Sequence, residues 1–110
     1  MNVAPQHTSL AAGKWFALTF AEQMGNIGSE VHRAVQWRAR DAQIFHHAID
    51  NALELIDITA RDMRWRGRLK EILRVREFLC DTVLGDNMYG TLEDFDEYFL
   101  QFAVVARNHT

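Results

Sequence analysis

The sequence predicts an all-α protein, a single domain built as an antiparallel four-helix bundle. Three observations predict this class. Apolar residues recur at the helical spacing of three and four positions, Thr or Asp capping residues stand before four such stretches, and Pro and Gly are scarce. The 110 residues include one Pro and six Gly, too few for the turns of a sandwich or barrel. A chain of this length can bury one core but not two.

The first two helices have recognisable starts. Thr19 followed three positions later by Glu22 is the capping-box pattern, and it predicts a helix over 20–38. Asp41 can cap a second helix that ends near residue 60. This second helix is apolar over more than half of its circumference, which is typical of a central helix or of one that faces another subunit.

Two further helices follow. Asp62 can cap a helix over 63–84, with Gly85 at its C-terminal cap. Thr91 and Asp94 repeat the capping pattern and predict a fourth helix that ends near residue 107. Short links between successive helices are typical of up-and-down bundles.

The bundle is predicted to occupy residues 19–107, between a flexible tail at 1–18 and a short C-terminal end at 108–110. The tail has no helical period and contains the single Pro, and Trp15 and Phe16 are candidates to dock on the bundle. No basic segment precedes an apolar run, so we expect no signal peptide, and no apolar stretch approaches a membrane span. The single cysteine, Cys80, fits a reducing compartment. These observations favour a cytoplasmic protein that does not enter a membrane.

The stretch AEQMGNIGSEV places small residues inside the first helix. Each Gly there costs about 1 kcal/mol relative to Ala, so their presence needs a reason. Small side chains spaced three or four apart let a second helix approach closely. The residues predicted to serve this close packing are Ala21, Gly25, Gly28 and Ser29. Room for a ligand beside the backbone is an alternative.

Charge is distributed unevenly along the chain. Residues 61–76 carry seven basic and two acidic side chains, whereas 81–98 carry six acidic and no basic ones. Cations at a helix start oppose its dipole, so helix formation does not explain the first of these arginines. The candidate binding residues are Arg64, Arg66, Arg68, Arg74 and Arg76.

Three partners for these arginines stay open. A solvated face with pairs inside the chain is the simplest, and carboxylates of a second subunit are another. Nucleic acid or nucleotide phosphates are the third, although the net charge of −3 weighs against them. The broad apolar faces of the helices favour a homo-oligomer.

Arg76 lies within the apolar arc of its helix and is therefore predicted to be buried. A buried guanidinium requires a paired carboxylate, for which Glu30, Glu54 and Asp57 are candidates. Loss of such a pair predicts destabilisation by more than about 2 kcal/mol in Arg76→Ala. The predicted buried polar network consists of Asn26, Glu30, Arg76 and Glu77.

Two catalytic interpretations can be compared with the sequence. MazG-type pyrophosphohydrolases hold Mg²⁺ with E-E-x-x-E on one helix and E-x-x-D on another, because Mg²⁺ prefers oxygen ligands. Glu54 and Asp57 fit the second motif, but the first motif reads Glu22-Gln23-Met24-Gly25-Asn26 and lacks two carboxylates. The sequence therefore predicts at most a degenerate relative, and no cofactor or metal is expected.

The second catalytic interpretation is an HEPN-like ribonuclease, whose R-x4–6-H motif acts across a dimer. Arg40 and His46 have this spacing, and they could supply a cation and a proton-transfer group. The motif is short, and here it spans a link between helices instead of lying near the C-terminus. Neither catalytic interpretation is favoured over a non-catalytic protein.

Four segments, AEQMGNIGSEV, ALELIDIT, RLKEILRVREFLCD and YFLQFA, together resemble a family of short bacterial and archaeal hypothetical proteins, over residues 15–107. The resemblance implies a four-helix fold and brings no established activity with it. The polar positions that match the family pattern are Asn26, Glu30, Arg33, Glu54, Asp57, Arg68, Glu71, Arg74, Arg76 and Glu77. The function that the sequence favours is a non-catalytic, oligomeric interaction or scaffold protein. The alternatives are the two nucleotide- or RNA-processing enzymes and an RNA- or DNA-binding accessory protein.

Overall fold

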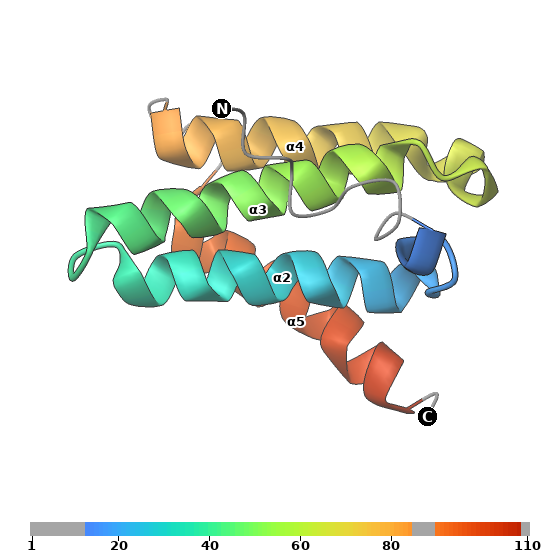
Figure 1. Ribbon diagram of the computed structural model, residues 1–110, viewed down its shortest axis with the longest axis horizontal. Helices are drawn as coiled ribbons and strands as arrows, with labels where there is room; N and C mark the ends of the chain where they lie inside the picture. The colour runs from blue at the N-terminus through green and yellow to red at the C-terminus, as the bar shows by residue number, and fades with distance from the viewer. Residues whose placement is uncertain (1–12, 85–89, 109–110) are drawn as a thin grey trace.

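The computed structural model describes residues 13–84 and 90–108, and every regular element among them is a helix. After a single helical turn at 13–15 come α2 (Phe20–Trp37), α3 (Ala42–Ala60), the 3-10 helix η1 (Met63–Arg68), α4 (Leu69–Leu84) and α5 (Leu92–Asn108). Helix α2 packs against both α3 and α5, whereas α4 packs on α3 and meets α5 less closely (Figure 1). The prediction of an all-α protein is confirmed.

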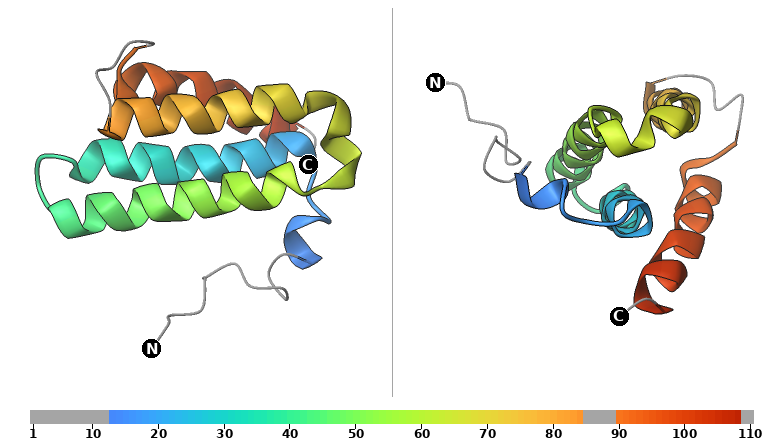
Figure 2. Two further views of the ribbon diagram at one scale, coloured as in Figure 1. Left: turned by 90° about the horizontal axis from the view of Figure 1, so that it is seen from above. Right: turned by 90° about the vertical axis from the view of Figure 1, so that its right-hand side faces the viewer.

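Helix α5 crosses the other helices obliquely, and its C-terminal end projects beyond them (Figure 2). Its inner face is anchored by aromatic rings. Phe102 packs edge to face on Phe20 of α2 at 5.9 Å between ring centroids, and Phe95 and Phe99 pack on each other at 4.8 Å. Aromatic pairs in this geometry stabilise a fold beyond the area they bury. The projecting half of α5 leaves Leu100 60% exposed.

The core lies between α2, α3 and the inner faces of α4 and α5. Met24, Ile27, Ile56, Leu79 and Phe99 are among its fully buried side chains. They come from all four α-helices, so each helix contributes an apolar face to one common core, as expected for a chain of this length. None of the helices within residues 13–84 and 90–108 is long and apolar enough to cross a membrane.

Three predicted helix starts are present. The Thr19 hydroxyl accepts a hydrogen bond from the Glu22 backbone N–H at 3.1 Å, and the Glu22 carboxylate accepts one from the Thr19 N–H at 2.8 Å. Asp41 accepts from the first backbone N–H groups of α3. Thr91 and Asp94 exchange the same pair of bonds at 3.1 Å each. These side chains satisfy backbone donors that have no partner inside the helix.

Asp62 is a helix cap as predicted, because its carboxylate accepts a hydrogen bond from the Arg64 backbone N–H at 3.0 Å. The predicted single helix over 63–84, however, is wrong at its beginning. Residues 63–68 form a 3-10 helix, and the chain turns out of helical geometry at Trp65 (φ −104°, ψ 23°) before α4 begins. The reason is tertiary: the Trp65 indole N–H donates to Gln23 of α2 at 2.7 Å. The predicted cap at Gly85 lies outside the described residues.

The predicted flexible tail does not extend to residue 18. Trp15 is only 8% exposed and belongs to the hydrophobic core. Its indole N–H donates to the Thr59 hydroxyl of α3 at 2.9 Å. The folded part of the chain therefore includes residues 13–18, and the rest of the predicted tail, 1–12, lies outside the described residues. The predicted end at 108–110 begins one residue too early, because Asn108 is the last residue of α5.

Candidate functional site

Gln23, which sequence reasoning missed, is a buried polar residue whose side-chain amide is fully hydrogen-bonded. Its side chain is 0% exposed. The amide nitrogen donates to the Trp15 carbonyl at 2.9 Å and to the Asp62 carboxylate at 3.1 Å. The amide oxygen accepts from the Trp65 indole at 2.7 Å. Both donors and the acceptor are satisfied, so this buried amide joins the N-terminal segment, α2 and η1.

Asp62 extends this network to the surface. Its carboxylate is 6% exposed and accepts hydrogen bonds from the backbone, Nε and Nη2 of Arg64, the last at 2.7 Å. Bonds from Arg64 lower the pKa of Asp62 despite its burial, with a further contribution from Gln23. The same Arg64 Nη2 donates to the Leu18 carbonyl at 2.7 Å. The five side chains Trp15, Gln23, Thr59, Asp62 and Trp65 are called the polar corner below.

Arg76 is paired as predicted with Asp57, but the pair is not buried. The guanidinium Nε lies 2.8 Å from an Asp57 oxygen, and the two side chains are 42% and 50% exposed. Arg76 stands at the border of the apolar face of α4, where a long side chain keeps its stem against the core and its head in water. The expectation of burial was therefore wrong.

The predicted buried polar network is not formed. Glu77 and Asn26 are exposed, and the Asn26 amide donates to a carbonyl one turn earlier in α2. Glu30 instead accepts from Asn51 of α3 at 3.3 Å. The four residues face different neighbours. The prediction failed because a helical wheel gives the direction of a side chain around its own helix but not how far the side chain reaches. The buried polar network of this fold is the polar corner.

The basic side chains of residues 61–76, the basic segment, fall into two groups. Some form hydrogen bonds or ion pairs with residues of the described chain, and the others, called the unused cations below, do not. Arg64 binds Asp62, and Arg68 binds Glu71 at 3.1 Å while its guanidinium lies 3.9 Å from the centroid of the Phe20 ring. These contacts inside the chain explain two of the arginines that oppose the helix dipole. The side chains with no hydrogen bond or ion pair to the described residues are Arg61, Arg66, Lys70 and Arg74.

Two exposed stripes, one basic and one acidic, combine charged side chains that have no partner among the described residues with apolar side chains. The basic stripe on η1 and α4 is Arg66, Leu69, Lys70 and Leu73. The acidic stripe on α5 is Glu93, Glu97, Leu100 and Val104, spaced four, three and four residues apart on one helical face. Within the described part of the chain, neither acidic residue of this stripe has a hydrogen bond or ion pair. Leu73 is 44% exposed.

The carboxylates of the MazG-like hypothesis serve other roles in this fold. Glu22 caps α2, and Asp57 pairs with Arg76. Glu54 is partly buried in α3. Residues 13–84 and 90–108 contain no group of three or more His, Cys, Asp or Glu side chains that could hold a metal ion. A site that binds Mg²⁺ through several carboxylates is therefore not assembled by these residues.

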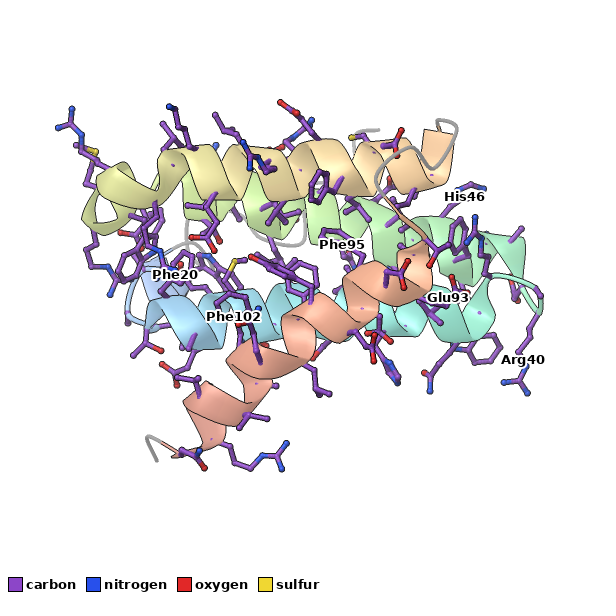
Figure 3. All side chains as sticks on the ribbon, turned by 180° about the vertical axis from the view of Figure 1, so that it is seen from behind. Phe20, Arg40, His46, Glu93, Phe95 and Phe102 are labelled. Atoms are coloured by element: carbon purple, nitrogen blue, oxygen red, sulfur yellow. The ribbon has the colours of Figure 1, made fainter. Side chains whose placement is uncertain are left out.

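The two residues of the HEPN-like hypothesis are not brought together within one chain. Arg40 lies in the link between α2 and α3, where its guanidinium stacks 5.3 Å from the Trp37 ring centroid. His46 lies on α3 with its ring against Phe45 at 5.2 Å. Figure 3 shows the two side chains on different sides of the end of the fold where α2 is linked to α3, pointing away from each other.

The glycines of α2 lie at its contact with α5. A Cβ atom at Gly25 would stand 3.6 Å from the Ala103 backbone, and one at Gly28 would stand 2.5 Å from the Cβ of Phe99. The close approach gives Gly28 a packing reason, whereas a Cβ atom at Gly25 would make only an ordinary contact. A shallow hollow beside this contact is lined in part by His32 and Asp96. The His32 Nδ1 atom lies 3.0 Å from Oδ2 of Asp96.

Comparison of the chain with protein families, with curated proteins and with solved structures finds no match. The missed residue Gln23 carried a weak signal in the sequence, because it is an amide on the apolar face of a helix.

Proposed function

We propose that this chain is a non-catalytic interaction protein of the cytoplasm that associates with copies of itself. The observation that carries the proposal is the pair of exposed stripes with opposite charge. The basic stripe offers two cations and two leucines, and the acidic stripe offers two carboxylates, a leucine and a valine. Exposed apolar side chains rimmed by charge are typical of protein–protein contacts.

The positions of the two stripes favour a partner outside the chain. Helix α5 begins at one end of the molecule, and η1 with the start of α4 lies at the other (Figure 1). Within the described residues, neither Glu93 nor Glu97 forms an ion pair with Arg66 or Lys70. A second copy can supply each stripe with its complement, because every copy carries both.

The proposal includes the finer description of the fold as an antiparallel four-helix bundle. Short links join α2 to α3 and α3 to η1, and all four α-helices share one core. The oblique path of α5 is the departure from a regular bundle. This departure supports the proposal, since it carries Leu100 and Val104 away from the core.

The unused cations also support a second candidate, binding of nucleic acid or a nucleotide through the basic segment. Arg61, Arg66, Lys70 and Arg74 could contact phosphates, as free guanidinium and ammonium groups do. The acidic stripe has no role in this candidate, which is why we favour self-association.

Light scattering after size exclusion tests the proposal at about 50 and about 500 mM salt, with absorbance recorded at 260 and 280 nm. We expect an assembly heavier than the 12.7 kDa chain at low salt, smaller at high salt and without excess absorbance at 260 nm. Leu100→Asp should give a monomer. Gln101→Asp, which adds the same charge outside the stripe, should assemble normally.

A monomer at both salt concentrations would contradict the proposal. Excess absorbance at 260 nm that disappears at high salt would contradict it too, and would assign the basic segment to phosphate. Assembly of Leu100→Asp to the same extent as the unmodified chain would exclude the acidic stripe.

A further inference from the structure

A cavity of about 370 Å³ lies between α4 and α5, which pack on each other less closely than α4 packs on α3. Its walls are mainly apolar and are formed by Val75 and Phe78 of α4 and by Phe95 and the ring of Tyr98 of α5. The volume lies within the range of about 300 to 1,000 Å³ that is usual for small-molecule sites. None of the catalytic hypotheses uses this cavity.

The aromatic walls are held in place by contacts with one another. Phe78 and Phe95 approach edge to face at 6.3 Å between centroids across the two helices, and Tyr98 stacks beside Phe95 at 6.1 Å. Such rings present flat, apolar surfaces that favour an aromatic or aliphatic body over a hydrated ion.

The two acidic groups at the cavity are already engaged. The Glu71 carboxylate accepts from Arg68 on one oxygen and from the Tyr98 hydroxyl on the other, both at 3.1 Å. Burial, followed by the neighbouring Glu71 charge, raises the pKa of Tyr98 to about 12, so its hydroxyl stays a donor to that carboxylate. Asp94 caps the backbone N–H of Thr91.

Arg74 is the exception among the charged groups of the cavity. It lines the cavity, is exposed, and has no hydrogen bond or ion pair with any residue in 13–84 or 90–108. A guanidinium keeps its charge at every physiological pH and presents donors in a fork that fits carboxylate, sulfonate or phosphate oxygens.

From this arrangement we propose that the cavity binds a small amphipathic anion, with an apolar or aromatic body between α4 and α5 and a single anionic head on Arg74. One cation without a partner among the described residues suits one anionic group. A nucleoside triphosphate would need several more cations or a metal ion, and the described lining residues do not provide them. This site is separate from the two stripes and does not depend on self-association.

Two fluorescent probes of nearly the same shape test the proposal. 8-Anilinonaphthalene-1-sulfonate carries an apolar body with one sulfonate, and N-phenyl-1-naphthylamine has the same body without the charge. The unmodified chain, Arg74→Gln and the matched control Arg66→Gln are each titrated with both probes. We expect Arg74→Gln to weaken binding of the sulfonate by about fivefold or more and to leave the neutral probe unchanged. Arg66→Gln should change neither.

The place of binding is checked separately by amide chemical shifts in the unmodified chain with the sulfonate probe. We expect the largest changes at Val75, Phe78, Phe95 and Tyr98. Changes centred on Leu100 and Val104 would overturn the proposal, because the probe would then lie on the acidic stripe. Equal weakening of both probes in Arg74→Gln, or no weakening of either, would also overturn it.

Discussion

The polar corner and the contact between α4 and α5 both join elements of the fold, but they differ in whether their polar groups have partners inside the chain. At the polar corner, Gln23 and Thr59 are buried, and each is satisfied both as a donor and as an acceptor. Between α4 and α5 a cavity remains, and Arg74 beside it has no partner among the described residues.

The difference separates polar groups that hold the fold together from polar groups without a partner among the described residues. A buried group without a partner is costly, so the partners at the polar corner are obligatory and fix how the N-terminal segment, α2, α3 and η1 meet. An exposed cation costs little when it is unpaired, so Arg74 and the stripe residues remain available for binding. The comparison predicts that changes at the corner reduce stability, whereas changes at the cavity and stripes affect binding.

Replacing Gln23 should have the largest effect. Gln23→Ala removes the partner of the Trp65 indole and of the Trp15 carbonyl, and it leaves a hole at a fully buried position. We expect a loss of about 3 kcal/mol in the free energy of unfolding, measured by urea denaturation. Gln36→Ala, at an exposed position of the same helix, should stay within about 0.5 kcal/mol of the unmodified chain. A loss below about 1 kcal/mol in Gln23→Ala would show that the network is dispensable.

Asp62 makes the stability of the corner depend on pH. Its pKa is lowered from 3.8 in the folded state, so the unfolded chain holds the proton more tightly. The contribution of Asp62 is therefore fully present above about pH 5 and is lost as the pH falls through the lowered folded pKa. Asp62→Asn should cost about 2 kcal/mol at pH 7 and less at pH 3, by urea denaturation at both values. An equal cost at both values would contradict the assignment.

The two glycines of α2 should respond in opposite directions. In Gly28→Ala the new methyl group would stand 2.5 Å from the Phe99 Cβ, so α5 must shift, and we expect a loss of about 1 to 2 kcal/mol. In Gly25→Ala the nearest atom is 3.6 Å away, an ordinary contact, and the gain in helix propensity is up to about 1 kcal/mol. Thermal unfolding of both variants checks this, and a gain of stability in Gly28→Ala would refute the close crossing.

Much of the helical frame could be predicted because its signals are local. The partners of the capping pairs, Thr19 with Glu22 and Thr91 with Asp94, are three residues apart. A short stretch of sequence therefore contains both partners. Gln23 could not be predicted in the same way. Its side-chain partners lie 39 and 42 residues further along the chain, and only the packed fold brings them together.

The errors in the predicted site have a related cause, because the contacts that side chains make across the fold are not local in the sequence. A helical wheel placed Arg76 in the apolar arc, but the length of its side chain carries the guanidinium out to Asp57. The kink at Trp65 was missed because the residue that accepts from its indole, Gln23, lies 42 residues away in the sequence. The uneven charge was visible in the sequence, although which cations remain unpaired depends on the fold.

The smallest effects are expected for the exposed arginines. Arg76→Ala breaks a pair whose two members are about half exposed, so we expect a loss of about 0.5 kcal/mol instead of the 2 kcal/mol predicted for a buried pair. Arg74→Ala should leave stability unchanged, because it breaks no bond to the described residues. Urea denaturation of both variants checks this, and a cost above about 2 kcal/mol for Arg76→Ala would restore the buried interpretation.

Mixing two charge-reversed variants tests the central claim, self-association through complementary stripes, most directly. One variant carries Arg66→Glu with Lys70→Glu, and the other carries Glu93→Lys with Glu97→Lys. Each alone would oppose like charges at every contact, whereas a one-to-one mixture restores opposite charges at all of them. By light scattering at low salt, we predict that each variant alone is monomeric and that the mixture has the mass of the unmodified assembly. A mixture that remains monomeric, or a single variant that assembles alone, would contradict the account.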